Sequence, residues 1–235
     1  MRIELSSVVG IELIAPGTPA FAEALELLLG RPADDVLRPA LPYSVIARNN
    51  DSRAVALLGI RFDMVGPRAK PYSVVHYADT LRHPEKSDLA PGGMRFVCAE
   101  PLYTDLVLRR AHEVDQRGRM NLQNLRTVLR IRASLDCAAF VDGQFAGPDS
   151  LGAFDRFAIE RDAEVALLNE VVSESGVPES VLRKALEIPP THTRDRGLIA
   201  RKALARQLQH SLEAGGIEEM RSCAQNHRLR LVLWR

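Results

Sequence analysis

Cysteine is scarce in this 235-residue chain, which holds only three, and they stand far apart in the sequence at Cys98, Cys137 and Cys223. An odd number of widely spaced cysteines does not suit a disulfide framework, so we interpret them as reduced thiols of a cytoplasmic protein. If a signal peptide had been removed, Cys98 and Cys137 could instead pair. The early apolar stretches are interrupted by acidic residues such as Glu12 and Glu23, so no secretory signal is predicted.

Long apolar runs and an excess of one charge are also missing. No run approaches the ~20 apolar residues of a membrane span, so no membrane association is predicted. The formal net charge is +1. A near-neutral chain lacks a global field that would steer it to nucleic acid or an anionic membrane, although a local basic patch stays possible. With 46% hydrophobic and 26% charged residues, the composition is that of an ordinary globular protein.

The familiar catalytic and cofactor motifs are absent too. The chain has no glycine-rich phosphate loop and no Gly-x-Ser-x-Gly elbow, so we predict no cofactor. One group of candidate metal or catalytic residues lies close together in sequence: His76, Asp79 and His83. Imidazole and carboxylate are common metal ligands. However, His76 lies in a strand pattern and His83 in a proline-bounded loop, so no helical spacing brings them together.

Period-two alternation of apolar residues runs through the first two-thirds of the chain. The opening alternates as one strand or two short ones, and a short helix is predicted near 19–30, capped by Thr18 and closed by Gly30. Further strand patterns cover residues 41–48, 54–65, 72–78, 94–98 and 125–137. In the last of these, Leu129 and Ile131 are predicted to face the core, whereas the arginines on the other parity face away.

Short strands joined by turns, with an Asp142-Gly143 hairpin signal after the last, predict an antiparallel β-sandwich over residues 1–148. At the level of this pattern the segment is similar to an immunoglobulin-like fold. It lacks the Cys…Trp…Cys signature of true immunoglobulin domains. Many unrelated functions share that architecture, so the resemblance implies no activity.

After Gly147-Pro148 the pattern changes to helical, which predicts a second region over residues 149–235 and an α+β class for the whole chain. Helices are expected at 153–174, 178–187 and 195–213. Leu229, Leu231 and Leu233 then alternate, which predicts a final strand at 228–235. We expect this strand to pair with the front sheet and to pack the helical region on it, or to offer an exposed edge to a partner chain.

Residues 170–186 resemble a DNA-binding helix-turn-helix. Gly176 falls at the turn, Val177 follows it, and Leu182 falls where the second helix packs on the first. The resemblance implies that Ser180, Arg183 and Lys184 project toward bases and phosphates. The segment departs from the family pattern at Val172, where a small residue is usual. A purely structural helical corner is the alternative.

A second possible contact surface is the stripe of Arg126, Arg130 and Arg132 on the predicted strand. Guanidinium groups on one face suit a phosphate or an acidic partner. The alternative is a solvated sheet face whose arginines pair with carboxylates on the neighbouring strand. The sequence therefore favours a non-enzymatic interaction or assembly module that binds a protein or itself. A DNA-binding regulator using residues 170–186 is the alternative, and an enzyme with a site near His76, Asp79 and His83 is the second.

Overall fold

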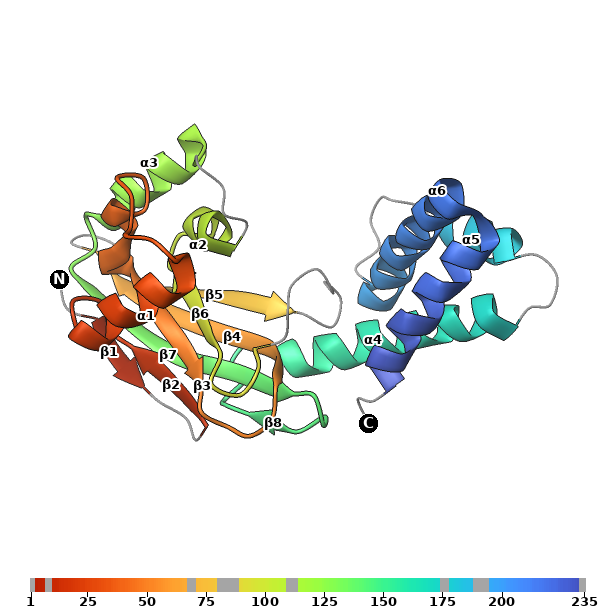
Figure 1. Cartoon of the computed structure of the whole chain (residues 1–235), viewed down its shortest axis with the longest axis horizontal. Coiled ribbons are helices and arrows are strands. Elements are labelled where there is room, and N and C mark those ends of the chain that lie inside the picture. Colours follow the sequence, from red (N-terminus) through yellow and green to blue (C-terminus); the bar gives the residue numbers. More distant parts are fainter. Residues whose placement is uncertain are drawn as a thin grey trace. The chain divides into compact units, whose positions relative to one another are not determined.

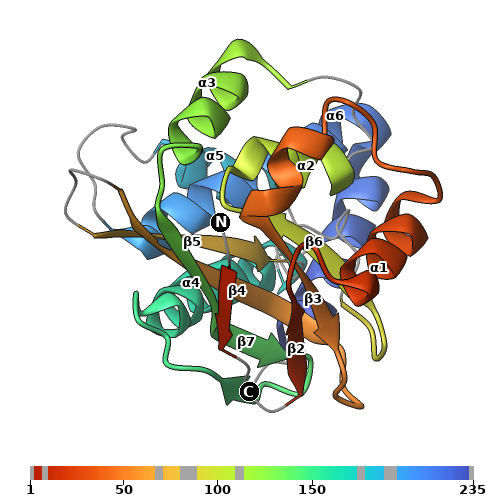
Figure 2. The same cartoon turned by 90° about the vertical axis from the view of Figure 1, so that its left-hand side faces the viewer.

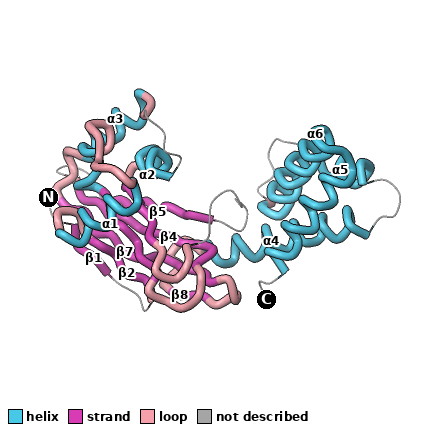
Figure 3. The backbone as a smooth tube through the Cα atoms, viewed as in Figure 1, coloured by secondary structure: helices cyan, strands magenta, loops and turns pink. Residues whose placement is uncertain are grey.

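The computed structural model describes seven stretches of the chain: residues 3–6, 10–66, 71–79, 89–108, 114–173, 178–187 and 195–232. The chain forms two compact units, Met1–Pro148 and Asp149–Arg235, which we call the sheet unit and the helical unit. All described strands belong to the sheet unit, and the described part of the helical unit contains helices only (Figure 3). The predicted α+β class is confirmed.

The larger sheet of the sheet unit has the strand order β1 (Ile3–Ser6), β7 (Arg130–Phe140), β4 (Val55–Val65), β5 (Tyr72–Asp79), and β8 (Phe145–Ala146) adds to β7. The central strand β7 is antiparallel to β4 and parallel to β1. That parallel pair differs from the all-antiparallel sandwich that the sequence predicts; the other pairings of described strands are antiparallel.

A smaller sheet contains β2 (Ile11–Ile14), β3 (Ser44–Asn49) and β6 (Met94–Cys98), with β3 in the middle. One apolar core includes residues of both sheets together with residues of α1 (Pro19–Leu29), α2 (Pro101–Leu108) and α3 (Gln116–Leu125). A short 3₁₀ helix, η1 (Arg38–Tyr43), contacts β3, β6 and α3. Figure 2 shows the helices α1 and α2 beside the smaller sheet.

Local signals at two predicted elements are confirmed by the backbone. The Phe21 amide donates to Thr18 Oγ1 over 3.2 Å at the start of α1, and Gly30 ends that helix at φ 64°. Because a side chain at that φ would be strained, glycine suits this position. The predicted hairpin joins β7 to β8 through Asp142-Gly143, where Gly143 has φ 84°.

The predicted strand at 125–137 begins five residues too early. Residues 116–125 form α3, whose first turn is capped by Asp115, since the Gly118 amide donates to Asp115 Oδ1 over 2.8 Å. Strand β7 starts only at Arg130. Ile131 is fully buried as predicted, but the prediction that Leu129 faces the core is wrong, because its side chain is 67% exposed.

The helical unit is built from α4 (Ala153–Ser173), α5 (Pro178–Leu186) and α6 (Arg196–Val232) (Figure 1). The first two agree with the predicted helices at 153–174 and 178–187, whereas α6 runs nineteen residues beyond the predicted end at 213. Gly216 breaks α6 with φ 74° and ψ −168°, three residues after the predicted helix end at 213. Ion pairs tie α6 to α4, from Arg196 to Glu160 and from Arg201 to Glu170.

The predicted C-terminal strand at 228–235 is wrong, because the chain stays helical to Val232. Side chains recur inside the unit at spacings of four and three, at Met220, Ala224, His227 and Leu231, whereas Leu229 is 60% exposed. This is the period of a helix. Residues 233–235 lie outside the described residues. In the part of the chain that the structure describes, no helix combines the length and apolar character needed to cross a membrane.

Candidate functional site

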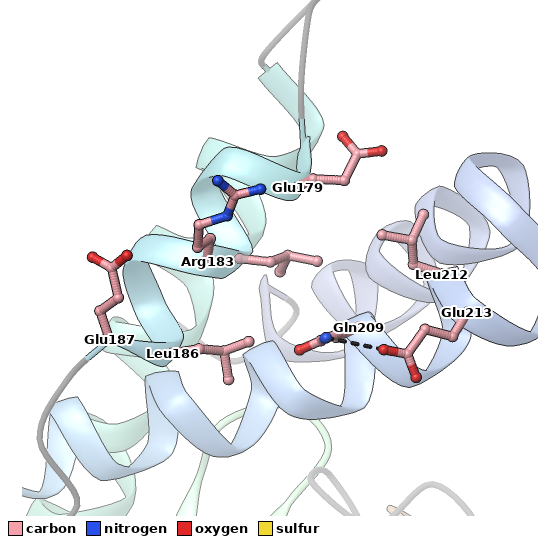
Figure 4. A pocket seen from close by; sticks show the side chains of 8 residues that line it. Glu179, Arg183, Leu186, Glu187, Gln209, Leu212 and Glu213 are labelled. Atoms are coloured by element: carbon pink, nitrogen blue, oxygen red, sulfur yellow. Dashed lines mark hydrogen bonds between the residues drawn. The ribbon is translucent and has the colours of Figure 1, made fainter.

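A groove of about 360 Å³ runs between α5 and the first half of α6 in the helical unit (Figure 4). Its walls come from two segments of sequence about 25 residues apart. The residues that line it are Glu179, Leu182, Arg183, Leu186, Glu187, Gln209, Leu212 and Glu213. The sequence alone does not indicate this juxtaposition.

Helix α5 is placed by one apolar face. Pro178 occupies the first helical position, where its missing N–H is not needed. Val181, Leu182 and Ala185 are buried at helical spacing, and α5 contacts both α4 and α6. The remaining face carries exposed cations, Arg183 among them, while Glu179 lies in the first turn. This order of charges suits the helix dipole.

The floor of the groove is apolar. Leu182 lines it and is 2% exposed, whereas Leu186 and Leu212 are half-buried and keep apolar surface open. Figure 4 shows Leu186 on α5 and Leu212 on α6 at the two sides of the groove. The site can therefore desolvate apolar side chains of a ligand, which is the main source of binding free energy in grooves of this kind.

The rim of the groove is acidic. Glu179, Glu187 and Glu213 supply three carboxylates against the single guanidinium of Arg183. Gln209 Nε2 donates to Glu213 Oε1 over 2.9 Å, which helps to hold that carboxylate at the rim (Figure 4). Carboxylates at the edge of an apolar site favour cationic ligands and oppose phosphate.

The residues of the predicted helix-turn-helix are partly placed by the structure. Arg183 and Lys184 are exposed, Ser180 is half-buried, and only Arg183 lines the groove. Gly176 and Val177 lie outside the described residues. Arg183 stands one turn from a glutamate on each side, Glu179 within α5 and Glu187 directly after its last residue, because residues four apart are neighbours on a helix.

The predicted metal or catalytic group is not assembled by the described residues. His83 lies outside them. His76 and Asp79 are three residues apart on β5, so they point to opposite faces of the sheet. His76 Nε2 lies 3.1 Å from the Ala99 carbonyl oxygen and donates to it, and its ring packs edge-on against Phe62. Burial lowers the pKa of His76, against this hydrogen bond, which favours the neutral ring.

The predicted arginine stripe is divided between two elements. Arg126 is the C-cap residue of α3 and not part of a strand. Arg130 and Arg132 begin β7 and are exposed. Arg132 stands opposite Asp63 of β4 in the register of the sheet, as the solvated-face alternative predicts.

The three cysteines are free thiols in the structure. Burial raises the pKa of the Cys98 thiol to about 12, so it is neutral and unreactive at physiological pH. Cys137 is likewise buried.

Comparison with family models, with curated proteins and with solved structures finds no match to this chain.

Proposed function

We propose that this protein is a non-enzymatic interaction module whose helical unit binds a cationic amphipathic helix of a protein partner in the groove between α5 and α6. The observation that carries the proposal is the combination of an apolar floor with an acidic rim. Apolar side chains of the partner would cover Leu186 and Leu212, while its lysines or arginines would lie beside the rim glutamates. Recognition of this kind uses anchors at i, i+3 or i+4 and i+7 of the bound helix.

The size of the groove supports this occupant. Its volume of about 360 Å³ lies within the range of roughly 300–1,000 Å³ that is typical of binding pockets. The groove is open and lies between two helices, so side chains carried on a partner helix can enter it.

DNA fits the same surface less well. A phosphate that approached Arg183 would also meet Glu179 and Glu187 on the same helix face, and like charges at such distances oppose binding. A recognition helix reads bases with its N-terminal residues, and in α5 that end carries Glu179. The groove therefore favours the protein partner over the alternative of a DNA-binding regulator.

The test uses a fluorescein-labelled, 14-residue leucine–lysine peptide with leucines at helical spacing, titrated with the full chain. Fluorescence anisotropy should show saturable binding that weakens as salt is raised. Changing Glu187→Lys and Glu213→Lys together should weaken binding at least tenfold, or about 1.4 kcal/mol. The matched control is Glu218→Lys, an exposed glutamate on α6 outside the groove, which should bind as the parent does.

Three results would overturn the proposal: no peptide binding at low salt, equal loss of binding in the control and the double variant, or a leucine–glutamate peptide of the same length binding as tightly. Circular dichroism melting of each variant checks that the charge changes leave the helical unit folded, as expected for exposed residues.

A further inference from the structure

Helix α3 of the sheet unit presents one stripe of long polar side chains to solvent. Gln116, Arg119, Gln123 and Arg126 are separated by three, four and three residues, so they lie along one face of the helix. All four are exposed. Arg126 keeps helical backbone angles, φ −63° and ψ −21°, so the stripe continues to the C-cap and spans about 15 Å.

The buried side of the same helix fixes the direction of this stripe. Gly118, Leu122 and Leu125 are buried at spacings of four and three. Gly118 has no room for a side chain, since a Cβ there would lie 2.4 Å from Val114 Cγ1 and 2.9 Å from Cδ1 of Leu102 on α2. The fit of α3 against the unit is therefore close, and the stripe cannot roll inward without opening the core.

Burial raises the pKa of Tyr103 on α2, and the charges of Arg119 and Arg126 act against this rise while the charge of Glu100 adds to it. Both cations of the stripe and one carboxylate therefore act on the same tyrosine.

Neither arginine forms an ion pair with a described carboxylate, although Asp115, the N-cap residue of α3, stands one helical turn before Arg119. Arg48, Arg53 and Arg61 each form an ion pair, whereas Arg119 and Arg126 form none among the described residues. The sequence around them is one-sided, since residues 116–135 contain five arginines and no aspartate or glutamate. Two cations on one helix face, about 10 Å apart along its axis, thus form a local positive surface.

We propose that this stripe, Gln116, Arg119, Gln123 and Arg126, binds the phosphodiester backbone of a nucleic acid. A guanidinium group donates two parallel hydrogen bonds to a phosphate, and glutamine amides between the arginines can donate to phosphate, sugar or base edges. An acidic protein would satisfy the charge as well. However, the one large apolar side chain exposed beside the stripe on α3 is Met120, which is too little to form the dry centre of a protein interface. This second surface is independent of the groove in the helical unit.

The test measures binding of the full chain to a fluorescein-labelled 20-base-pair DNA duplex, and to the corresponding single-stranded DNA and RNA, at 50 mM salt and above. We expect binding of at least one of the three probes. Changing Arg119→Gln and Arg126→Gln together should weaken it at least tenfold. For the duplex, the slope of log K against log salt should fall by about two, roughly 0.9 for each lost phosphate contact.

Arg117→Gln is the matched control, because Arg117 is also exposed on α3 but points away from the stripe, about 160° around the helix from Arg119. This variant should keep most of the affinity. The proposal is overturned if none of the three nucleic acids binds at 50 mM salt, or if the control loses as much as the double variant. It is also overturned if a 20-residue polyglutamate peptide binds more tightly than every nucleic acid probe. The leucine–lysine peptide of the first proposal should bind the Arg119/Arg126 variant normally, so the two proposals fail separately.

Discussion

Replacing Ile131 with alanine, beside the matched change Leu129→Ala, tests where strand β7 begins and which way it faces. The two residues are two positions apart and share a parity, so an uninterrupted strand would bury both. In the structure Ile131 is fully buried, whereas Leu129 is 67% exposed just before the strand. From the structure we therefore expect the two truncations to lower the free energy of unfolding by very different amounts.

The magnitude follows from the neighbours of Ile131. It stands opposite Met64 of β4 in the register of the sheet, and that methionine is 1% exposed. Truncation of a buried isoleucine to alanine costs about 2–5 kcal/mol, and a flexible methionine can fill part of the cavity. We expect about 2–4 kcal/mol for Ile131→Ala. Leu129→Ala removes apolar surface that is already in water and should change the free energy of unfolding by less than about 0.5 kcal/mol.

Urea denaturation followed by far-ultraviolet circular dichroism gives both values, read from the midpoint at an unchanged slope. A lowered melting temperature of roughly 6–12 °C for Ile131→Ala would agree with that range. If Leu129→Ala destabilises the protein as strongly as Ile131→Ala, the strand begins earlier than residue 130 and α3 ends earlier too. If neither change lowers the free energy of unfolding, β7 is not the centre of the sheet.

Three further predictions concern ionisable groups. The hydrogen bond and ion pair with Arg53 hold the pKa of Asp51 at about 2, below its ordinary 3.8. The contribution of this carboxylate to stability is therefore complete above about pH 4 and is lost as the pH falls toward 2. Asp51→Asn should flatten that part of an acid-unfolding curve. The side chains of Glu164 and His227 are both 6% exposed, with 3.8 Å between Oε2 and Nε2. Glu164→Leu or His227→Leu alone should lower the free energy of unfolding by about 2–3 kcal/mol, because each leaves the other polar group buried without its partner. In a double-mutant cycle measured by denaturation, the double change should cost less than the sum of the two. Cys98 should resist Ellman's reagent at pH 8 until urea unfolds the chain, and rapid labelling in the folded state would contradict its burial.

Strands and caps with strong local signals could be predicted from the sequence. Residues 54–65 alternate over many positions, and β4 occupies Val55–Val65. Thr18 and Gly30 bound α1 because a hydroxyl acceptor and a left-handed glycine act on the nearest backbone groups and need no tertiary partner. Such signals are complete within a few residues of the chain.

The wrong strand predictions come from short segments of sequence in which the same apolar residues fit both the period of a strand and the period of a helix. Leu229, Leu231 and Leu233 alternate as a strand does, but a window reaching back to Met220 contains the helical spacings that the structure uses. Leu125 likewise has the parity of the strand that follows, although it is the last residue of α3. The Asp115 cap and the 4,3 spacing of Gly118, Leu122 and Leu125 are the signals that would have shown this helix.

The groove could not be predicted for a different reason. Leu186 and Leu212 each read as ordinary core leucines of separate amphipathic helices. Whether such a residue is covered or open depends on how far α5 and α6 stand apart, and that distance is set by packing among residues distant in sequence. A pattern within one helix contains no information about it.

The net charge of +1 gives no indication of the acidic groove rim or of the basic α3 stripe, because it sums charged side chains that do not contact the same ligand. At physiological ionic strength a charge acts over about 8 Å, so a ligand responds to the residues it touches and not to the total. The rim of the groove places three carboxylates around one guanidinium, while the α3 stripe holds two guanidinium groups that form no ion pair with a described carboxylate. Near-neutrality therefore removes only long-range steering, and it leaves room for a cationic helix and a nucleic acid on separate units. If both proposals hold, raising the salt concentration weakens both probes, while each set of charge changes affects one probe alone. If the protein instead bound both probes through one nonspecific electrostatic surface, every charge variant would change the affinity for both probes.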